Sequence, residues 1–180
     1  MPEPAGTAEV FETIEELEVT DEADARADFD ARFALARERL LRIVGSLIGA
    51  QEADDVVHDT YLLGRQRFGQ LRDRSAFDPW LTRIAVNQCF GRHRRTRRLR
   101  ELLPTLAPRR LAASDVGLRE LVELLQPRER TVLVLHYGHG YQLDEIATLL
   151  DLTHTDVRSI IARTRKRLFT AWREAEGLDR

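Results

Sequence analysis

The stretch from Gln142 to Arg163 constrains the fold more than any other part of the sequence. Its apolar and small residues recur at helical spacing on both sides of a short break: Ile146, Ala147, Leu150, Leu152, Val157 and Ile160. This spacing lets two helices cross closely through a short turn, with the small Ala147 at the closest approach. Thr153 and Asp156 have the spacing of a capping box for the second helix. The pattern predicts a helix-turn-helix.

The rest of the chain is also predicted to be helical. One apolar stripe recurs at three- and four-residue steps up to Gly49: Phe29, Phe33, Ala36, Leu40, Val44 and Leu47. A second helix is expected from about Asp54 and Asp55. A third is expected to start at a capping box of Ser75 and Asp78 and to continue into the basic run 92–100. The second half is expected to hold four helical segments, at about 117–125, 127–137, 143–150 and 154–176. Because no strand-like alternation persists, we expect an all-α chain of two small helical domains joined by a linker, the second containing the helix-turn-helix.

Charge and proline divide the chain further. Residues 1–28 hold ten acids and one base, a formal charge of −9, which leaves +7 on the rest of a chain whose total is −2. We predict an acidic, flexible extension over 1–28, helical domains over 29–100 and 117–180, and a linker over 101–116 that contains Pro104 and Pro108. The extension is either a solubilising tail or a segment that lies over the basic helices in competition with DNA.

Several function classes are excluded by what the sequence lacks. Its one cysteine, Cys89, allows no internal disulfide, which indicates a reducing cytoplasm. Cys89 itself is predicted to be a small core residue. No apolar run is long enough to insert in a membrane. His136, His139 and His154 are interpreted as solvated or capping residues and not as metal ligands. We expect no catalytic residues, no cofactor and no metal, and the chain is not predicted to be an enzyme.

Two basic surfaces indicate a nucleic-acid partner. The outward face of the second helix of the helix-turn-helix carries residues that contact phosphates and base edges in a major groove: Thr155, Arg158, Ser159, Ala162, Arg163 and Lys166. The run 92–100 supplies a phosphate-binding surface, and aromatic residues of the same helix can stack on unpaired bases.

Both halves resemble one protein family. The segments EADDVVHDTYLLGRQRF (52–68) and FDPWLTRIAVNQCFGRHRR (77–95) resemble region 2 of the extracytoplasmic-function sigma factors, small sigma-70-type subunits of bacterial RNA polymerase. The segments LLQPRERTVLVLHYGHGYQLDEIATLLDL (124–152) and DVRSIIARTRKRL (156–168) resemble region 4. The two occur in the family's order over residues 29–176.

The resemblance implies roles residue by residue. It places docking on the polymerase clamp helices at Asp54, Asp55, His58 and Asp59. Reading and melting of the −10 element falls on Trp80, Arg83, Asn87, Arg92, Arg94 and Arg95, and the loop 68–77 lies where a flipped base is captured. The −35 element is read by the outward face at 155–166. The implied partners are core RNA polymerase through its clamp helices and flap, promoter DNA and an anti-sigma factor.

The sequence departs from the family's pattern at several of these positions. His58 and Asp59 replace a usual Gln and acid, and Gly91 replaces a common Asp. Asp151 replaces the usual turn glycine and can still adopt a left-handed conformation at modest cost. Asp156 enters the recognition helix, where it would repel a phosphate. Two other functions remain open from the residues: a dimeric helix-turn-helix regulator that acts without replacing the sigma subunit, and a module whose basic helices bind an acidic protein.

Overall fold

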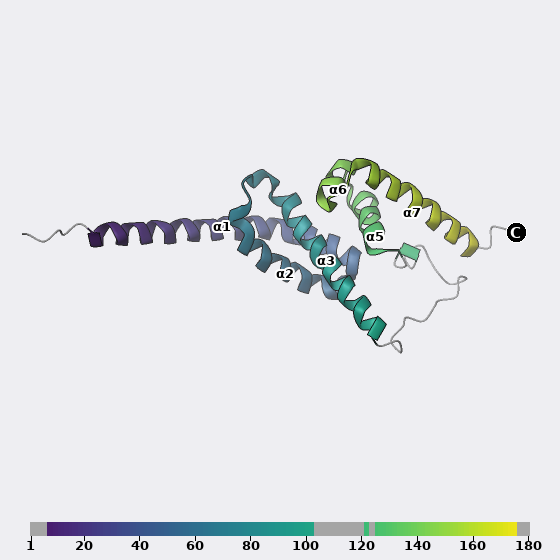
Figure 1. Ribbon diagram of the computed structural model, residues 1–180, viewed down its shortest axis with the longest axis horizontal. Helices are drawn as coiled ribbons and strands as arrows, with labels where there is room; N and C mark the ends of the chain where they lie inside the picture. Colours follow the sequence, from purple (N-terminus) through teal and green to yellow (C-terminus); the bar gives the residue numbers. More distant parts are fainter. Residues whose placement is uncertain (1–6, 103–120, 123–124, 176–180) are drawn as a thin grey trace, which may run out of the picture.

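The structure is a computed structural model that describes residues 7–102, 121–122 and 125–175 (Figure 1). The main helices are α1 (Thr7–Ile48), α2 (Ala50–Arg67), α3 (Phe77–Leu102), α5 (Pro127–Leu133), α6 (Leu143–Leu150) and α7 (His154–Ala175). Two short 3₁₀ helices, η1 (Phe68–Gln70) and η2 (Arg74–Ala76), separate α2 from α3, and a π-helical turn, η5 (Val134–Gly138), follows α5. The all-α prediction is confirmed. Most of the expected linker and of a helix expected at 117–125 lies outside the described residues.

The first half of the chain is a bundle of α1, α2 and α3. All six residues of the expected α1 stripe are buried, from Phe29 and Leu40 at 0% exposure to Phe33 at 8%. Gly49 ends α1 with a φ of 97°, a conformation that side chains other than glycine's rarely adopt. The expected start of α2 near Asp54 is wrong, because Gly49 turns the chain so tightly that α2 begins at Ala50.

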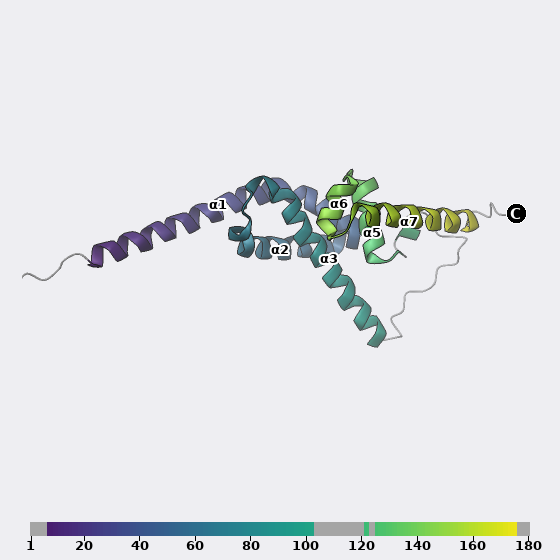
Figure 2. The same cartoon turned by 45° about the horizontal axis from the view of Figure 1, so that its top comes forward.

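The α1 helix reaches much further toward the N-terminus than its apolar stripe. It is continuous from Thr7 through Asp28 into the bundle. Both views show its N-terminal half projecting beyond the bundle, on the side opposite the C-terminal end of α3 (Figures 1 and 2). The backbone of residues 7–28 therefore does not lie over the basic run of α3 or over α7, because the unbroken helix carries it along the axis of α1.

The second half packs α5, α6 and α7 around Leu135, Ile146 and Val157, which are 0% exposed. A helix was expected over about 127–137. Instead α5 ends at Leu133 and the chain widens into η5, after which the backbone N–H of Tyr141 donates to the carbonyl of Leu135 at 3.0 Å.

The two halves share one hydrophobic core. At their junction the Tyr141 hydroxyl accepts a hydrogen bond from Arg39 Nη1 at 3.0 Å and lies 3.5 Å from the hydroxyl of Thr82. Arg39 also forms an ion pair with Asp78 at 3.0 Å, and Arg130 Nη1 donates to the carbonyl of Leu47 at 3.1 Å. These contacts hold α5 and α6 against α1 and α3 (Figure 2).

Candidate nucleic-acid interface

The turn between α6 and α7 has the geometry of a helix-turn-helix. Asp151 adopts the left-handed conformation expected there, with φ 55° and ψ 54°, and the backbone N–H of Leu152 donates to the carbonyl of Ala147 at 2.9 Å. The expected capping box of α7 is present in both directions. The Asp156 N–H donates to Thr153 Oγ1 at 3.1 Å, and the Thr153 N–H donates to Asp156 Oδ2 at 3.1 Å.

The face of α7 singled out from the sequence is turned to solvent. Thr155, Arg158, Ala162, Arg163 and Lys166 are exposed and Ser159 is half-buried, whereas Val157 and Thr164 on the opposite face are buried. This face can therefore meet a major groove without any rearrangement of α7.

Asp156 takes part in the cap and does not simply oppose a phosphate. The hydroxyl and the backbone N–H of Thr153 donate to its carboxylate and hold its pKa below the ordinary value, with smaller contributions from Arg128 and Arg163. The negative charge is thus partly satisfied within the protein at the start of α7, where the helix dipole also favours an acid.

A second exposed polar face runs along α3. Arg83, Asn87, Arg94 and Arg95 are exposed, and the first three follow Trp80 at helical spacing. Trp80 is half-buried, with its ring centroid 5.9 Å from that of Phe77 and 6.5 Å from that of Phe68. The face combines guanidinium groups, an amide and an aromatic edge, which are the groups that bind unpaired bases and their phosphates.

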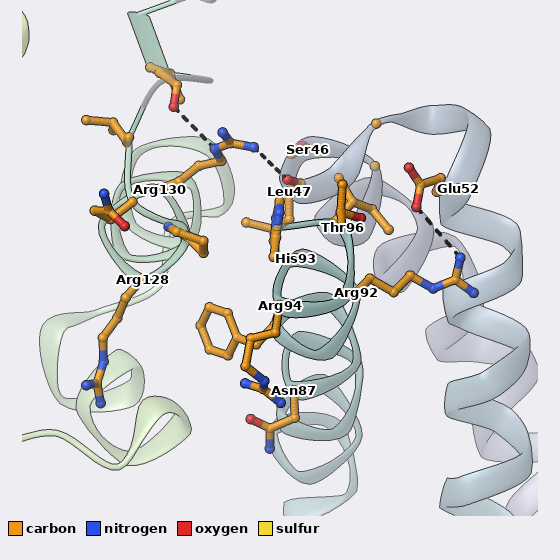
Figure 3. A pocket seen from close by; sticks show the side chains of 18 of the residues that line it. Ser46, Leu47, Glu52, Asn87, Arg92, His93, Arg94, Thr96, Arg128 and Arg130 are labelled. Atoms are coloured by element: carbon orange, nitrogen blue, oxygen red, sulfur yellow. Dashed lines mark hydrogen bonds and ion pairs between the residues drawn. The ribbon is translucent and has the colours of Figure 1, made fainter. Parts of the chain in front are cut away.

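Arg92 points away from this face. Its guanidinium contacts three carboxylates of α2, Asp59 at 3.1 Å, Glu52 at 3.7 Å and Asp55 at 3.8 Å. Figure 3 shows Arg92 turned toward α2, whereas Asn87 and Arg94 point to the other side of α3. The structure thus separates Arg92 from Asn87 and Arg94, which were grouped with it by sequence. Sequence reasoning missed Glu52 as a partner of Arg92.

The four polymerase-docking candidates on α2 are all exposed, and their carboxylates pair with arginines of two different helices. Asp54 accepts from Arg37 of α1 at 3.0 Å, whereas Asp55 and Asp59 face Arg92 of α3. His58 stacks beside Tyr61 with ring centroids 6.5 Å apart. The spacing of Glu52, Asp55 and Asp59 along one helical face is the signal from which their common partner could have been found.

A basic cleft of about 1670 Å³ separates the C-terminal part of α3 from α5. Arg42, Arg92, Arg94, Arg128 and Arg130 line it, and Glu52 is an acid among its lining residues. Several of these groups already have protein acceptors: Arg128 donates to the Leu150 carbonyl at 3.4 Å, and Arg130 donates to the carbonyls of Leu47 and Val122 (Figure 3). The cleft is therefore mainly a junction between the two halves.

The residues considered for other chemistry have structural contacts. Cys89 is 1% exposed in the core, as predicted, and burial raises the pKa of its thiol to about 12. His136 Nδ1 lies 3.0 Å from the Tyr141 carbonyl. Within the described part of the chain, no three His, Cys, Asp or Glu side chains are grouped to hold a metal ion, and no described helix is both long and apolar enough to cross a membrane.

Comparison with known families finds a matching model in each half of the chain. The family model for sigma-70 region 2 matches residues 33–99, and that for sigma-70 region 4 matches residues 116–168. The chain belongs to the extracytoplasmic-function sigma factors of the sigma-70 family. A sigma factor brings RNA polymerase to promoters, so the alternative of a dimeric regulator that leaves the sigma subunit in place is not favoured.

Individual relatives agree with this assignment. The sigma factor is 28% identical over 159 residues to the ECF RNA polymerase sigma factor SigM of Mycobacterium tuberculosis, a match that covers 85% of this chain and 81% of SigM. It is 26% identical over 171 residues to the RNA polymerase sigma-H factor of Pseudomonas aeruginosa, with 83% and 88% of the two chains covered.

Two solved structures have a similar fold. One is the sigma factor RpoE of Bartonella quintana in complex with the anti-sigma factor NepR, with a TM-score of 0.64 and 20% identity over 85% of this chain and 99% of that one. The other is CnrH in complex with the cytosolic domain of CnrY, with a TM-score of 0.57 and 26% identity over 83% and 92% of the two chains.

Proposed function

We propose that this sigma factor contacts promoter DNA through two separate helical faces and docks on core RNA polymerase through α2. The observation that carries the proposal is that one chain combines a fully capped helix-turn-helix with a second exposed basic helix, α3. A dimeric regulator needs the first of these features, whereas promoter opening needs both. We infer that the protein works in the cytoplasm, where the polymerase is.

The −35 element is proposed to meet the exposed face of α7. Arg163 and Ser159 lie one helical turn apart, so both can reach base edges of one groove. Arg158 and Lys166 are proposed to hold phosphates, because they flank this pair on the same exposed face. Thr155 and Ala162 complete the surface, as a hydroxyl and a methyl group that can approach a base closely.

The −10 element is proposed to meet α3 through Trp80, Arg83, Asn87, Arg94 and Arg95, and the loop 68–77 is proposed to receive a flipped base of its non-template strand. The exposure of Arg83, Asn87, Arg94 and Arg95 supports this role, as does the helical spacing of the first three from Trp80. Arg92 has a weaker claim, because its guanidinium faces the carboxylates of α2. We propose that Arg92 fixes α2 against α3 and reaches DNA only when those carboxylates are engaged elsewhere.

Polymerase docking is proposed for Asp54, Asp55, His58 and Asp59, with the flap meeting the second half of the chain. The clustering of exposed carboxylates on one helix supports this assignment. We also propose an anti-sigma protein as a partner, because the relative from Bartonella quintana was solved bound to one.

The proposal is tested by reconstituting the full chain with core RNA polymerase and transcribing a fragment library. Promoter-specific transcripts that depend on the chain support it. Polymerase-independent binding to a palindromic duplex, with no such transcripts, contradicts it.

Docking is tested separately by charge reversal on α2. Asp54→Lys with Asp55→Lys should abolish co-purification with core polymerase, and Asp54→Lys alone should weaken it without touching the contacts of Arg92. The matched control, Asp24→Lys with Glu38→Lys, makes the same charge change at exposed positions of α1. Wild-type recovery of polymerase by the α2 double variant would refute the docking assignment.

A further inference from the structure

The loop between α2 and α3 is more ordered than its polar sequence suggests. Within residues 68–77, the Leu71 N–H donates to the Phe68 carbonyl at 3.1 Å and the Ala76 N–H donates to the Asp73 carbonyl at 3.1 Å. The backbone N–H and the hydroxyl of Ser75 both donate to Asp73 Oδ1, at 2.9 and 2.6 Å. The Ser75 hydroxyl is therefore used at η2, and not in the expected capping box with Asp78.

Arg74 ties the two ends of this loop together. Its guanidinium carbon lies 3.6 Å from the centroid of the Phe68 ring, and its Nη1 donates to the Phe68 carbonyl at 2.7 Å. Phe68 itself is held firmly, because it is 3% exposed and packs edge-on against Phe77 with ring centroids 5.9 Å apart. A planar guanidinium can stack and donate at the same time, which an ammonium group cannot do in this geometry.

A second arginine anchors the loop to the bundle. Arg32 of α1 donates from Nη1 to the Arg74 carbonyl at 3.2 Å, and its Nε is paired with Asp28 at 2.7 Å. One turn earlier on α1, Phe29 packs against Phe68 with ring centroids 5.2 Å apart. Helix α1 thus fixes the loop twice, through the ring contact of Phe29 and through the hydrogen bond from Arg32.

We propose that Arg74, held in place by Arg32, is a positioning residue that fixes the loop 68–77 in its DNA-receiving shape before DNA arrives. The inference rests on the proposed function, in which this loop meets a base of the −10 strand. Gln70 and Arg72 are left exposed at its tip to meet that base. Arg74 does not contact DNA itself, since its guanidinium is occupied by the ring and the carbonyl of Phe68.

A loop that is already ordered binds more tightly, because binding does not have to order it. Leaving a single backbone residue to be ordered on binding lowers affinity by about tenfold. The expected effect of losing Arg74 is therefore a drop of about tenfold in affinity for a single-stranded −10 oligonucleotide. Affinity for the −35 duplex should not change, since α7 is remote from the loop.

The test uses Arg74→Gln in the full chain, with Arg65→Gln as a matched loss of one exposed arginine on α2. Hydrogen exchange of the chain alone should be faster in Arg74→Gln at the amides of Leu71, Ser75 and Ala76, and unchanged in the control. Arg32→Gln removes the contact to the Arg74 carbonyl, together with the pair to Asp28, and leaves Arg74 on Phe68. It should produce the same change in smaller measure if Arg74→Gln folds poorly.

Fluorescence anisotropy of the reconstituted holoenzyme then measures binding of two probes from one selected promoter, the −10 non-template strand and the −35 duplex. A loss confined to the single strand, with an unchanged salt dependence, supports a positioning role. A flatter salt dependence means that Arg74 holds a phosphate, and it overturns the proposal. Unchanged single-strand affinity, or unchanged exchange of the loop amides, overturns it too. If the wild-type holoenzyme binds no promoter strand, the proposed function fails, while the exchange data still decide whether Arg74 orders the loop.

Discussion

Replacing Gly64 by alanine should destabilise the protein even though alanine is the better helix former. Gly64 is buried on α2, and a Cβ there would lie 3.1 Å from Leu81 Cδ1 and 3.1 Å from Phe29 Cζ. Both neighbours are 0% exposed, and the Phe29 ring is enclosed by aromatic rings of α1, α2 and the loop 68–77. Neither can move aside without disturbing the core on which that loop rests.

The magnitude follows from two opposing terms. Alanine gains about 1 kcal/mol over glycine in a helix interior. Overfilling a packed core costs about 1–3 kcal/mol. The net expectation for Gly64→Ala is a loss of up to about 2 kcal/mol in the free energy of unfolding.

Gly91→Ala on α3 is the matched control, because the nearest atom to its added Cβ is Arg94 Nη2 at 4.0 Å, an ordinary contact. It should stabilise the protein by up to about 1 kcal/mol. The difference between the two variants, about 1–3 kcal/mol, is then the crowding term itself. Urea denaturation followed by far-UV circular dichroism measures both. A Gly64→Ala protein as stable as Gly91→Ala would refute the reasoning.

The remaining predictions concern the junction, the recognition face and the cap. Tyr141→Phe should lower the free energy of unfolding by about 1–3 kcal/mol, because Arg39 keeps Asp78 but loses its second acceptor, and urea denaturation would show it. Arg163→Ala should cost about 1–3 kcal/mol of base discrimination in a promoter-library selection. Arg158→Ala should instead weaken all sequences alike and flatten the salt dependence; identical salt slopes would argue against a phosphate contact. Asp156→Asn should destabilise the protein near neutral pH. Because the pKa of Asp156 is depressed on folding, that difference should close as the pH falls below the ordinary value of 3.8, which denaturation at several pH values would follow.

Local patterns predicted the helices and the helix-turn-helix well, because each depends on residues close together in the chain. The stripe that begins at Phe29, the left-handed Asp151 and the box of Thr153 with Asp156 are all present as expected. The start of α2 was misplaced because Asp54 resembles a helix start, whereas Gly49 supplies the turn without any capping side chain.

Contacts between distant residues could not be predicted in the same way. Arg92 belongs by sequence to a basic run, and only packing of α2 against α3 brings it to Asp59. Tyr141 carries no local signal for Arg39, which lies far away on α1. The loop around Arg74 was expected to be merely polar, because a cation over an aromatic ring has no spacing rule that marks it in a sequence.

The burial of Cys89 makes the sigma factor suitable for site-specific labelling at introduced cysteines. It is the one cysteine of the chain, and its buried thiol, with a pKa raised to about 12, is almost entirely protonated at neutral pH. Labelling reagents react with the thiolate, so the native protein is close to inert toward them. New cysteines at Leu62 on α2 and Phe169 on α7, two exposed positions on different halves, can therefore carry a pair of dyes. The separation of the two halves can then be followed in solution, and again on the polymerase, without replacing the native cysteine.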